Sequence, residues 1–368
     1  MTPLPESAIS SPATRILVRA TNWLGDSVMM MPAVQRLREL YPSPAHIALL
    51  CPSKLYDLWR HNAFVDEVLA FDGTVDIRVL CERRFDLAVL FPNSLRSAWE
   101  AWRAGIPRRV GFTGHARRFL LTDVVREPRG DRPVYKTLVV DGKQFRVKHF
   151  EPIRHQVYRH LDLVGHLGGN RASCPPRIWL GSDATALLDK FLGHDPRPVI
   201  GLNAGAEYGP AKRWFPDRFA AVARRVSDKI ASRWLLLGGP CDVEIAGTIE
   251  ATLRTQATDQ SSIINVAGKT TLLELCALLQ SCKVLLTNDT GSMHLAGALD
   301  VPQVAIFGST SPELTGPLSD RATVIRHPVE CSPCFRRECP IDFRCMTQVT
   351  VDEVANTVAA KLLRVDKS

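Results

Sequence analysis

The sequence lacks several features that assign a protein to a class at once. No apolar run approaches the roughly 18 consecutive residues of a membrane-spanning helix. The first 13 residues show no basic segment followed by an apolar core, which argues against a secretory signal. No Gly-x-Gly-x-x-Gly fingerprint is present, which disfavours hydride transfer with a dinucleotide. We therefore expect a cytoplasmic chain whose cysteines are mostly free thiols.

The composition is that of an ordinary globular protein. Hydrophobic residues make up 45% of the 368 and charged residues 23%. This length predicts two domains. The formal net charge of +8 suggests an anionic partner, which could be nucleic acid, a membrane surface or a phosphorylated substrate.

Short apolar runs alternate with helical patterns along most of the chain, which predicts parallel sheets covered by helices. In the first half we expect strands at 15–19, 45–50 and 85–91, helices at 25–40, 55–61, near 99–103 and at 151–167, and a long loop between 122 and 150. In the second half we expect strands at 198–203, 233–238, 263–266, 284–287 and 303–307, and helices at 216–226, 243–253, 272–281, 292–299 and 351–363. The Gly-, Pro- and Ser-rich stretch that follows Leu167 is the natural linker between the halves.

One candidate site opens the first half. Asn22 and Trp23 precede Gly25, which permits a tight turn from strand to helix, and Asp26 follows near the start of that helix. A carboxylate there could simply cap the helix. It could also act as a general base that takes a proton from an attacking hydroxyl.

Two loops of the second half could approach a phosphorylated ligand. The first runs from 203 to 214; Gly205 and Ala206 would let a ligand approach the backbone, and Lys212 could hold a phosphate. This loop has no Gly-Lys-Ser/Thr and is not a Walker loop. The second carries Gly238 and Gly239 at the end of a strand, where a phosphate or base could lie. The alternative for the first loop is a solvated surface segment.

The segment from 287 to 294 is the most informative, because it joins a buried strand to a helix. Thr290, Gly291 and Ser292 would present backbone N–H groups at a helix N-terminus, where an anion binds. The Asp289 carboxylate suits sugar hydroxyls, and His294 lies on the first turn. The alternative is a capped helix with a core histidine.

Two further groups remain open. Cys331, Cys334, Cys339 and Cys345 could ligate zinc, but only one pair has knuckle spacing, which favours reduced structural thiols. The second group is the arginine-rich stretch, whose members could form a solvated basic face or bind a polyanionic acceptor. These arginines are Arg103, Arg108, Arg109, Arg117 and Arg118.

Taken together, these segments resemble the ADP-heptose:lipopolysaccharide heptosyltransferases of glycosyltransferase family 9, and within that family the type II members. The resemblance rests on NWLGD (22–26), GAEYGPAKRW (205–214), LLLGGP (235–240), NDTGSMHLA (288–296), FGSTSPELTGP (307–317) and the cysteine region. Type I members carry two threonines in the loop before the lysine; Gly205 and Ala206 stand there in this sequence, which favours type II.

The resemblance implies an α/β fold of GT-B type, in which two Rossmann-like, doubly wound parallel-sheet domains face a central cleft. The expected division is a flexible tail (1–13), an acceptor-binding domain (14–167), a linker (168–176), a nucleotide-sugar-binding domain (177–350) and a C-terminal helix that crosses back to the first domain (351–368).

The implied reaction is inverting transfer of heptose from ADP-L-glycero-D-manno-heptose to the heptosyl-Kdo-lipid A inner core in lipopolysaccharide biosynthesis, with no metal and no cofactor. The sequence contains no Asp-x-Asp, in keeping with metal-independent catalysis. The implied catalytic residues are Asp26, as the base, and Lys212. The implied donor-binding residues are Gly205, Ala206, Lys212, Gly238, Gly239, Asp289, Thr290, Gly291, Ser292 and His294. The expected acceptor-binding residues are Asn22, Trp23, Arg108, Arg109, Arg117 and Arg118.

The partners implied are ADP-heptose, a phosphorylated Kdo-lipid A core and the anionic cytoplasmic surface of the inner membrane, with peripheral attachment through the basic charge. Two alternatives stay open. One is another GT-B nucleotide-sugar enzyme with a different donor, or an epimerase. The other is a nucleic-acid-binding protein with a metal in the cysteine cluster, against which the scarcity of aromatics beside the arginines counts.

Overall fold

The computed structural model describes residues 14–365 except 129, 131, 182, 183, 257, 258, 260 and 261. The expected tail at 1–13 lies outside these residues. The chain divides into two compact units. Unit 1 holds the residues up to Pro128 together with Val157–Cys174, and unit 2 holds 129–156 and everything from Pro175 onward.

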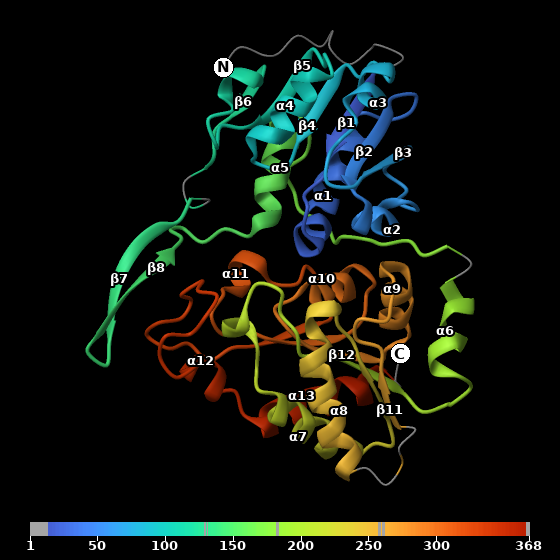
Figure 1. Ribbon diagram of the computed structural model, residues 1–368, viewed down its shortest axis with the longest axis vertical. Helices are drawn as coiled ribbons and strands as arrows, with labels where there is room; N and C mark the ends of the chain where they lie inside the picture. The colour runs from blue at the N-terminus through green and yellow to red at the C-terminus, as the bar shows by residue number, and fades with distance from the viewer. Residues whose placement is uncertain are drawn as a thin grey trace. The chain divides into compact units, whose positions relative to one another are not determined.

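Unit 1 contains a six-stranded parallel sheet in the order β3-β2-β1-β4-β5-β6 (Figure 1). Its elements are β1 (Arg15–Arg19), α1 (Leu24–Leu40), β2 (His46–Pro52), η2 (Ser53–Leu55), α2 (Tyr56–Trp59), β3 (Glu67–Phe71), α3 (Ile77–Glu82), β4 (Leu87–Leu90), α4 (Leu95–Arg103), β5 (Arg108–Phe112), η3 (Arg118–Leu120), β6 (Asp123–Val125) and α5 (Gln156–His166). The central strands read as unbroken apolar runs because helices cover both faces of the sheet.

Unit 2 repeats this design with the order β11-β10-β9-β12-β13-β14. Its elements are β7 (Val134–Val140), β8 (Lys143–His149), α6 (Ala184–Leu192), β9 (Val199–Asn203), η4 (Pro210–Lys212), α7 (Pro216–Ser227), β10 (Arg233–Leu236), η5 (Pro240–Asp242), α8 (Val243–Gln256), β11 (Ile263–Asn265), α9 (Leu272–Ser281), β12 (Val284–Asn288), α10 (Gly291–Ala298), β13 (Gln303–Ile306), α11 (Pro312–Thr315), β14 (Ala322–Ile325), α12 (Arg344–Thr347) and α13 (Val351–Val365). The expected pair of doubly wound Rossmann-like sheets is confirmed.

The loop expected between 122 and 150 is wrong. The segment contains β6 and an antiparallel hairpin formed by β7 and β8, drawn as a long two-stranded ribbon in Figure 1. Asp141 and Gly142 join the hairpin strands with φ of 50° and 73°, the left-handed pair that a two-residue hairpin turn requires. The hairpin belongs to unit 2, where Arg336 donates to the Arg146 carbonyl at 3.1 Å.

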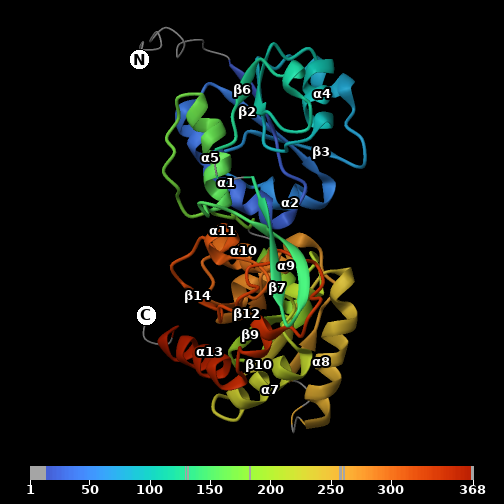
Figure 2. The same cartoon turned by 90° about the vertical axis from the view of Figure 1, so that its left-hand side faces the viewer.

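The last helix also differs from its expected place. Helix α13 packs beside α7, as Figure 2 shows, and against β12 and β13. Its buried residues Val354, Val358 and Leu362 belong to the apolar core of unit 2. Because this face is used within unit 2, the helix forms part of that unit rather than of the first domain.

Candidate functional site

In unit 2, polar side chains gather where β9, β12 and β13 end. Strand β9 pairs with β10 on one side and with β12 on the other, so the chain order reverses at β9. In open α/β sheets, ligands bind outside the carboxyl ends of the strands at such a switch point. The loops that follow β9 and β12 carry most of the predicted donor residues.

Lys212 and Asp289 form the electrostatic centre of this region. The Lys212 Nζ lies 2.6 Å from the Asp289 Oδ2, and the two side chains are 14% and 4% exposed. Thr310 donates a further hydrogen bond to the same carboxylate oxygen at 2.7 Å. The lysine ammonium also lies 5.0 Å from the centroid of the Tyr208 ring. The Lys212 ammonium is thereby held in a fixed position with little access to solvent.

Two buried asparagines shape the loop that carries Lys212. Asn288 donates to the Ala204 carbonyl at 2.7 Å and accepts from the Trp214 N–H at 3.1 Å, so it holds both ends of the loop. Asn203 donates to the Ser292 hydroxyl at 2.8 Å and accepts from the Gly205 N–H at 3.0 Å. These asparagines and Thr310 are not among the site residues predicted from the sequence. Their position at the carboxyl ends of buried strands is the signal that could have found them.

The start of α10 has no side-chain cap on its first backbone amides. Thr290 is the N-cap and makes no side-chain capping bond; its hydroxyl lies 3.2 Å from that of Thr287. The first amides of a helix have no partner within the helix, and the helix dipole favours negative charge there. Gly291 and Ser292 open this first turn, directly after Asp289. The predicted donor-binding residues from 289 to 292 therefore lie together where the loop after β12 meets the first turn of α10.

The predicted glycines meet around another carboxylate. Asp242 accepts from the Gly239 N–H at 3.1 Å. A Cβ on Gly205 would stand 2.1 Å from the Asp242 carboxyl group, and one on Gly238 would stand 2.7 Å from its Cβ. A side chain at either position would have to displace Asp242. Ala206, the other predicted donor-binding residue beside Gly205, is buried.

His294 is a buried neutral imidazole. Burial lowers its pKa from 6.5 to about 4; Asp289 opposes this shift, while His155 and Lys212 add to it. A neutral ring beside Lys212 adds no second positive charge at neutral pH. The predicted proximity of His294 to the Asp289 region is thus present in the structure.

This burial predicts a pH-dependent stability. As the pH falls below 6.5, the unfolded chain protonates this histidine before the native chain does, so the free energy of unfolding decreases, by about 3 kcal/mol at pH 4. We expect His294→Gln to flatten the decrease between pH 6.5 and 4 in urea unfolding. His61→Gln, which changes an exposed histidine, is the control and should keep the wild-type slope. Equal slopes for both variants would contradict the assignment.

In unit 1, the candidate base lies on the first turn of α1. The N-cap is Trp23, so Asp26 is the third helical residue and not the cap. The turn before it is fixed by Thr21 and Ser27, whose hydroxyls lie 3.0 Å apart. The exposed Trp23 ring has the Lys54 Nζ 5.0 Å from its centroid. Asp26 itself is partly exposed, as a group that takes up a proton from a substrate must be.

The predicted acceptor-binding arginines have unequal surroundings. Arg117 is fully buried and donates to the carbonyls of Phe112 and Pro92, so here it supports the polypeptide of its own unit. Arg108 is paired with Asp123 at 2.9 Å. Arg109, on the same strand, donates to the Leu120 carbonyl at 2.7 Å. Arg108 and Arg109 lie on β5, and Arg117 lies on a buried turn. Their contact with an acceptor stays a prediction.

Arg118 and Asn22 complete the acceptor set. Arg118 is exposed at the start of η3. Asn22 is exposed and accepts from Arg19 at 3.2 Å. Asn22 thus holds its side-chain oxygen beside a guanidinium, just before the turn that carries Asp26. The contacts predicted for Arg118 and Asn22 also stay predictions.

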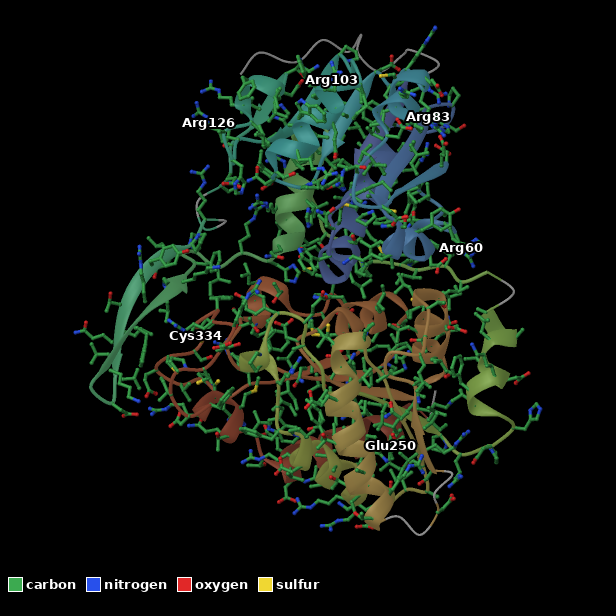
Figure 3. The ribbon with its side chains drawn as sticks, viewed as in Figure 1. Arg60, Arg83, Arg103, Arg126, Glu250 and Cys334 are labelled. Carbon is green, nitrogen blue, oxygen red and sulfur yellow. The ribbon has the colours of Figure 1, made fainter. Side chains whose placement is uncertain are left out.

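The four clustered cysteines, of which Cys334 is labelled in Figure 3, are free thiols that line one small, mostly apolar pocket with Phe145 and Val147 of β8. Burial, and then the neighbouring thiols, raises the pKa of Cys345 to about 12. Within the described residues, no three His, Cys, Asp or Glu side chains are arranged to hold a metal ion.

Comparison with known proteins identifies the family. The model of glycosyltransferase family 9 (heptosyltransferase) matches residues 77–343. Lipopolysaccharide heptosyltransferase 2 of Escherichia coli K12 is 32% identical over 330 residues, which cover 85% of this chain and 88% of the relative. Lipooligosaccharide heptosyltransferase 2 of Campylobacter jejuni NCTC 11168 is 34% identical over 348 residues, which cover 92% and 96%.

A solved structure agrees with these relatives. The E. coli ADP-heptose lps heptosyltransferase II superposes with a TM-score of 0.78 at 29% identity, covering 96% of this chain and 100% of the other. The two-sheet architecture is therefore that of a GT-B heptosyltransferase. The family match also decides against a nucleic-acid-binding module, which the basic charge alone had left open.

Proposed function

The chain belongs to glycosyltransferase family 9, the heptosyltransferases, and on that premise we propose that it transfers heptose from ADP-L-glycero-D-manno-heptose to the heptosyl-Kdo-lipid A inner core of lipopolysaccharide. The observation that carries this proposal is the similarity to heptosyltransferase 2 enzymes over most of both chains. It makes the chain a glycosyltransferase of lipopolysaccharide core biosynthesis.

The geometry of unit 2 supports a donor site for ADP-heptose. Lys212 supplies a fixed positive charge beside the first turn of α10, whose amides favour an anion. The diphosphate of the donor would bind against both. Asp289 holds Lys212 through one carboxylate oxygen, and the carboxylate is of the right chemistry to accept from heptose hydroxyls. Gly239 leaves room for the nucleotide beside the end of β10, whereas Asp242 fills the space at Gly238.

The chemistry is a single displacement. Asp26 takes the proton of the acceptor hydroxyl, and that oxygen forms a bond to the anomeric carbon of heptose. The bond from this carbon to the ADP oxygen breaks on the opposite face, so the anomeric configuration inverts. The negative charge that develops on the ADP is stabilised by Lys212 and the first amides of α10. No residue forms a covalent intermediate.

The proposed acceptor is anchored in lipid, so the enzyme must work at the cytoplasmic surface of the inner membrane. None of the helices in the described part of the chain is long and apolar enough to cross a bilayer. The formal charge of +8 supports peripheral attachment to anionic lipid. The exposed Arg108 and Arg118 and the partly exposed Arg109 are the proposed contacts for phosphates of the acceptor core.

The proposal is tested by incubating the purified protein with ADP-heptose and heptosyl-Kdo-lipid A and measuring the acceptor by mass spectrometry. We expect a mass increase of one heptose residue and release of ADP. Addition of a chelator should leave the rate unchanged, because the proposed displacement uses side chains and amides alone. An acceptor that keeps its mass while the protein is folded would contradict the proposal.

A further inference from the structure

Helix α4 of unit 1 exposes large apolar side chains. Leu95, Trp99 and Trp102 are 46%, 45% and 48% exposed. They are four and three residues apart, so they form one stripe along the helix. The outer face of a surface helix is normally polar, and contiguous exposed apolar surface marks an interaction site. The stripe therefore calls for a partner.

The orientation of the helix is firmly set by its other face. Ala98 and Ala101 are buried in the apolar core of unit 1. Ser94 caps the helix by accepting from the Ser97 N–H at 3.2 Å. Arg117 adds a hydrogen bond to the Ser97 hydroxyl at 3.1 Å. Since the inner face is already packed, the outer stripe is not needed for the core of unit 1.

The exposed charge along this stretch of the chain has one sign. Arg96 and Arg103 are exposed on the same side of it, and Figure 3 labels Arg103 at the end of α4. Between residues 95 and 119 the sequence has six arginines and one acidic residue, Glu100. Glu100 is 2% exposed and is paired internally with Arg19 at 3.5 Å and Arg96 at 2.9 Å. No carboxylate is exposed in this stretch, all of which the structure describes.

The neighbouring turn η3 extends this character. It packs against α4 and carries Phe119, whose side chain is 76% exposed, beside the exposed Arg118. Aromatic and cationic side chains thus alternate over two adjacent elements of the same unit.

We propose that the α4 face, defined as Leu95, Trp99 and Trp102 with Arg96 and Arg103, docks on an anionic lipid bilayer. Tryptophan side chains settle at the boundary between headgroups and hydrocarbon, and arginines bind lipid phosphates. A helix with an apolar stripe flanked by arginines lies in the plane of the membrane–water interface. A second copy of the chain fits less well, because a two-fold contact would bring the same exposed arginines together. This proposal depends on the proposed function in one respect: a lipid-anchored acceptor is the reason why the enzyme would bind a membrane.

The test is co-sedimentation of the full chain with vesicles in about 0.1 M salt. We expect binding to phosphatidylethanolamine vesicles with about 30 mol% phosphatidylglycerol and little binding to pure phosphatidylcholine. The triple variant Leu95→Ser/Trp99→Ser/Trp102→Ser should lose about tenfold or more in partitioning. Arg103→Glu should weaken binding to the anionic vesicles and make that binding less sensitive to salt. The matched control, Tyr135→Ser/Val139→Ser, changes exposed apolar residues of β7 and should bind as wild type.

The control readouts separate this proposal from the enzymatic one. The triple variant should keep its thermal midpoint, because the changed residues are exposed, and its heptosyl transfer to a delipidated, water-soluble core acceptor. Wild-type partitioning of a folded triple variant would overturn the docking proposal without touching the activity. A wild-type dimer by light scattering that the triple variant loses, with no vesicle binding by either, would also overturn it. If the triple variant unfolds and loses transfer to the soluble acceptor, the single variant Trp99→Ser replaces it. Trp99→Ser should stay folded and still partition less to vesicles than wild type.

Discussion

Asp26→Asn is expected to lower kcat by about 10³-fold while ADP-heptose still binds with near wild-type affinity. The amide has nearly the shape of the carboxylate but cannot take a proton from the acceptor hydroxyl. Donor affinity should persist because the proposed donor residues, such as Lys212 and Asp289, all belong to unit 2. The measurements are steady-state kinetics with both substrates and calorimetric binding of ADP-heptose.

The matched control is Asp57→Asn. Asp57 also stands in the first turn of a helix of unit 1, where it lies 3.6 Å from Arg60, but it has no proposed role in transfer. This variant should turn over like wild type. If Asp26→Asn were as active as Asp57→Asn, with folding intact in both, Asp26 would not be the base.

Lys212→Met is expected to reduce kcat/KM for ADP-heptose by about 10²- to 10³-fold, because it removes the fixed charge that stabilises the leaving diphosphate. It should also lower the free energy of unfolding by about 3 kcal/mol, since it leaves the buried Asp289 carboxylate without its cation. Kinetics and urea unfolding measure the two effects separately.

A second substitution distinguishes these effects. In Lys212→Met/Asp289→Asn the uncompensated charge is gone, so we expect much of the stability to return while transfer stays low. Lys190→Met is the control, because Lys190 forms an equally short pair with Glu274, at 2.7 Å, but its side chain is 62% exposed. Recovery of full transfer in the double variant would exclude Lys212 from the reaction.

The sequence predicted most of what positions the donor site. The apolar runs at 199–202 and 284–286 are unbroken because parallel strands are covered on both faces, and this pattern is readable without a structure. The turn residues that follow them were also readable, since glycine and capping residues have local causes. This is why Lys212, Asp289 and Gly291 fall in one region, as the sequence indicated.

What the sequence did not predict depends on contacts between distant segments. Arg117 is buried with its guanidinium bonded to the carbonyls of Pro92 and Phe112. No local sequence pattern predicts these contacts. The hairpin at 134–149 was missed although Asp141-Gly142 is a hairpin turn signal, because the Pro, Gly and mixed charge at 126–136 suggested a long loop. The exposed stripe of α4 was missed because a helical apolar pattern does not say which face is covered.

The identity of the sugar nucleotide that serves as donor decides which reaction this enzyme catalyses. An equimolar mixture of ADP-heptose, UDP-glucose and GDP-mannose, offered with heptosyl-Kdo-lipid A, tests it in one reaction followed by mass spectrometry. We predict that the acceptor gains the mass of heptose and that ADP is the nucleotide released. A gain of hexose mass with release of UDP or GDP would contradict it.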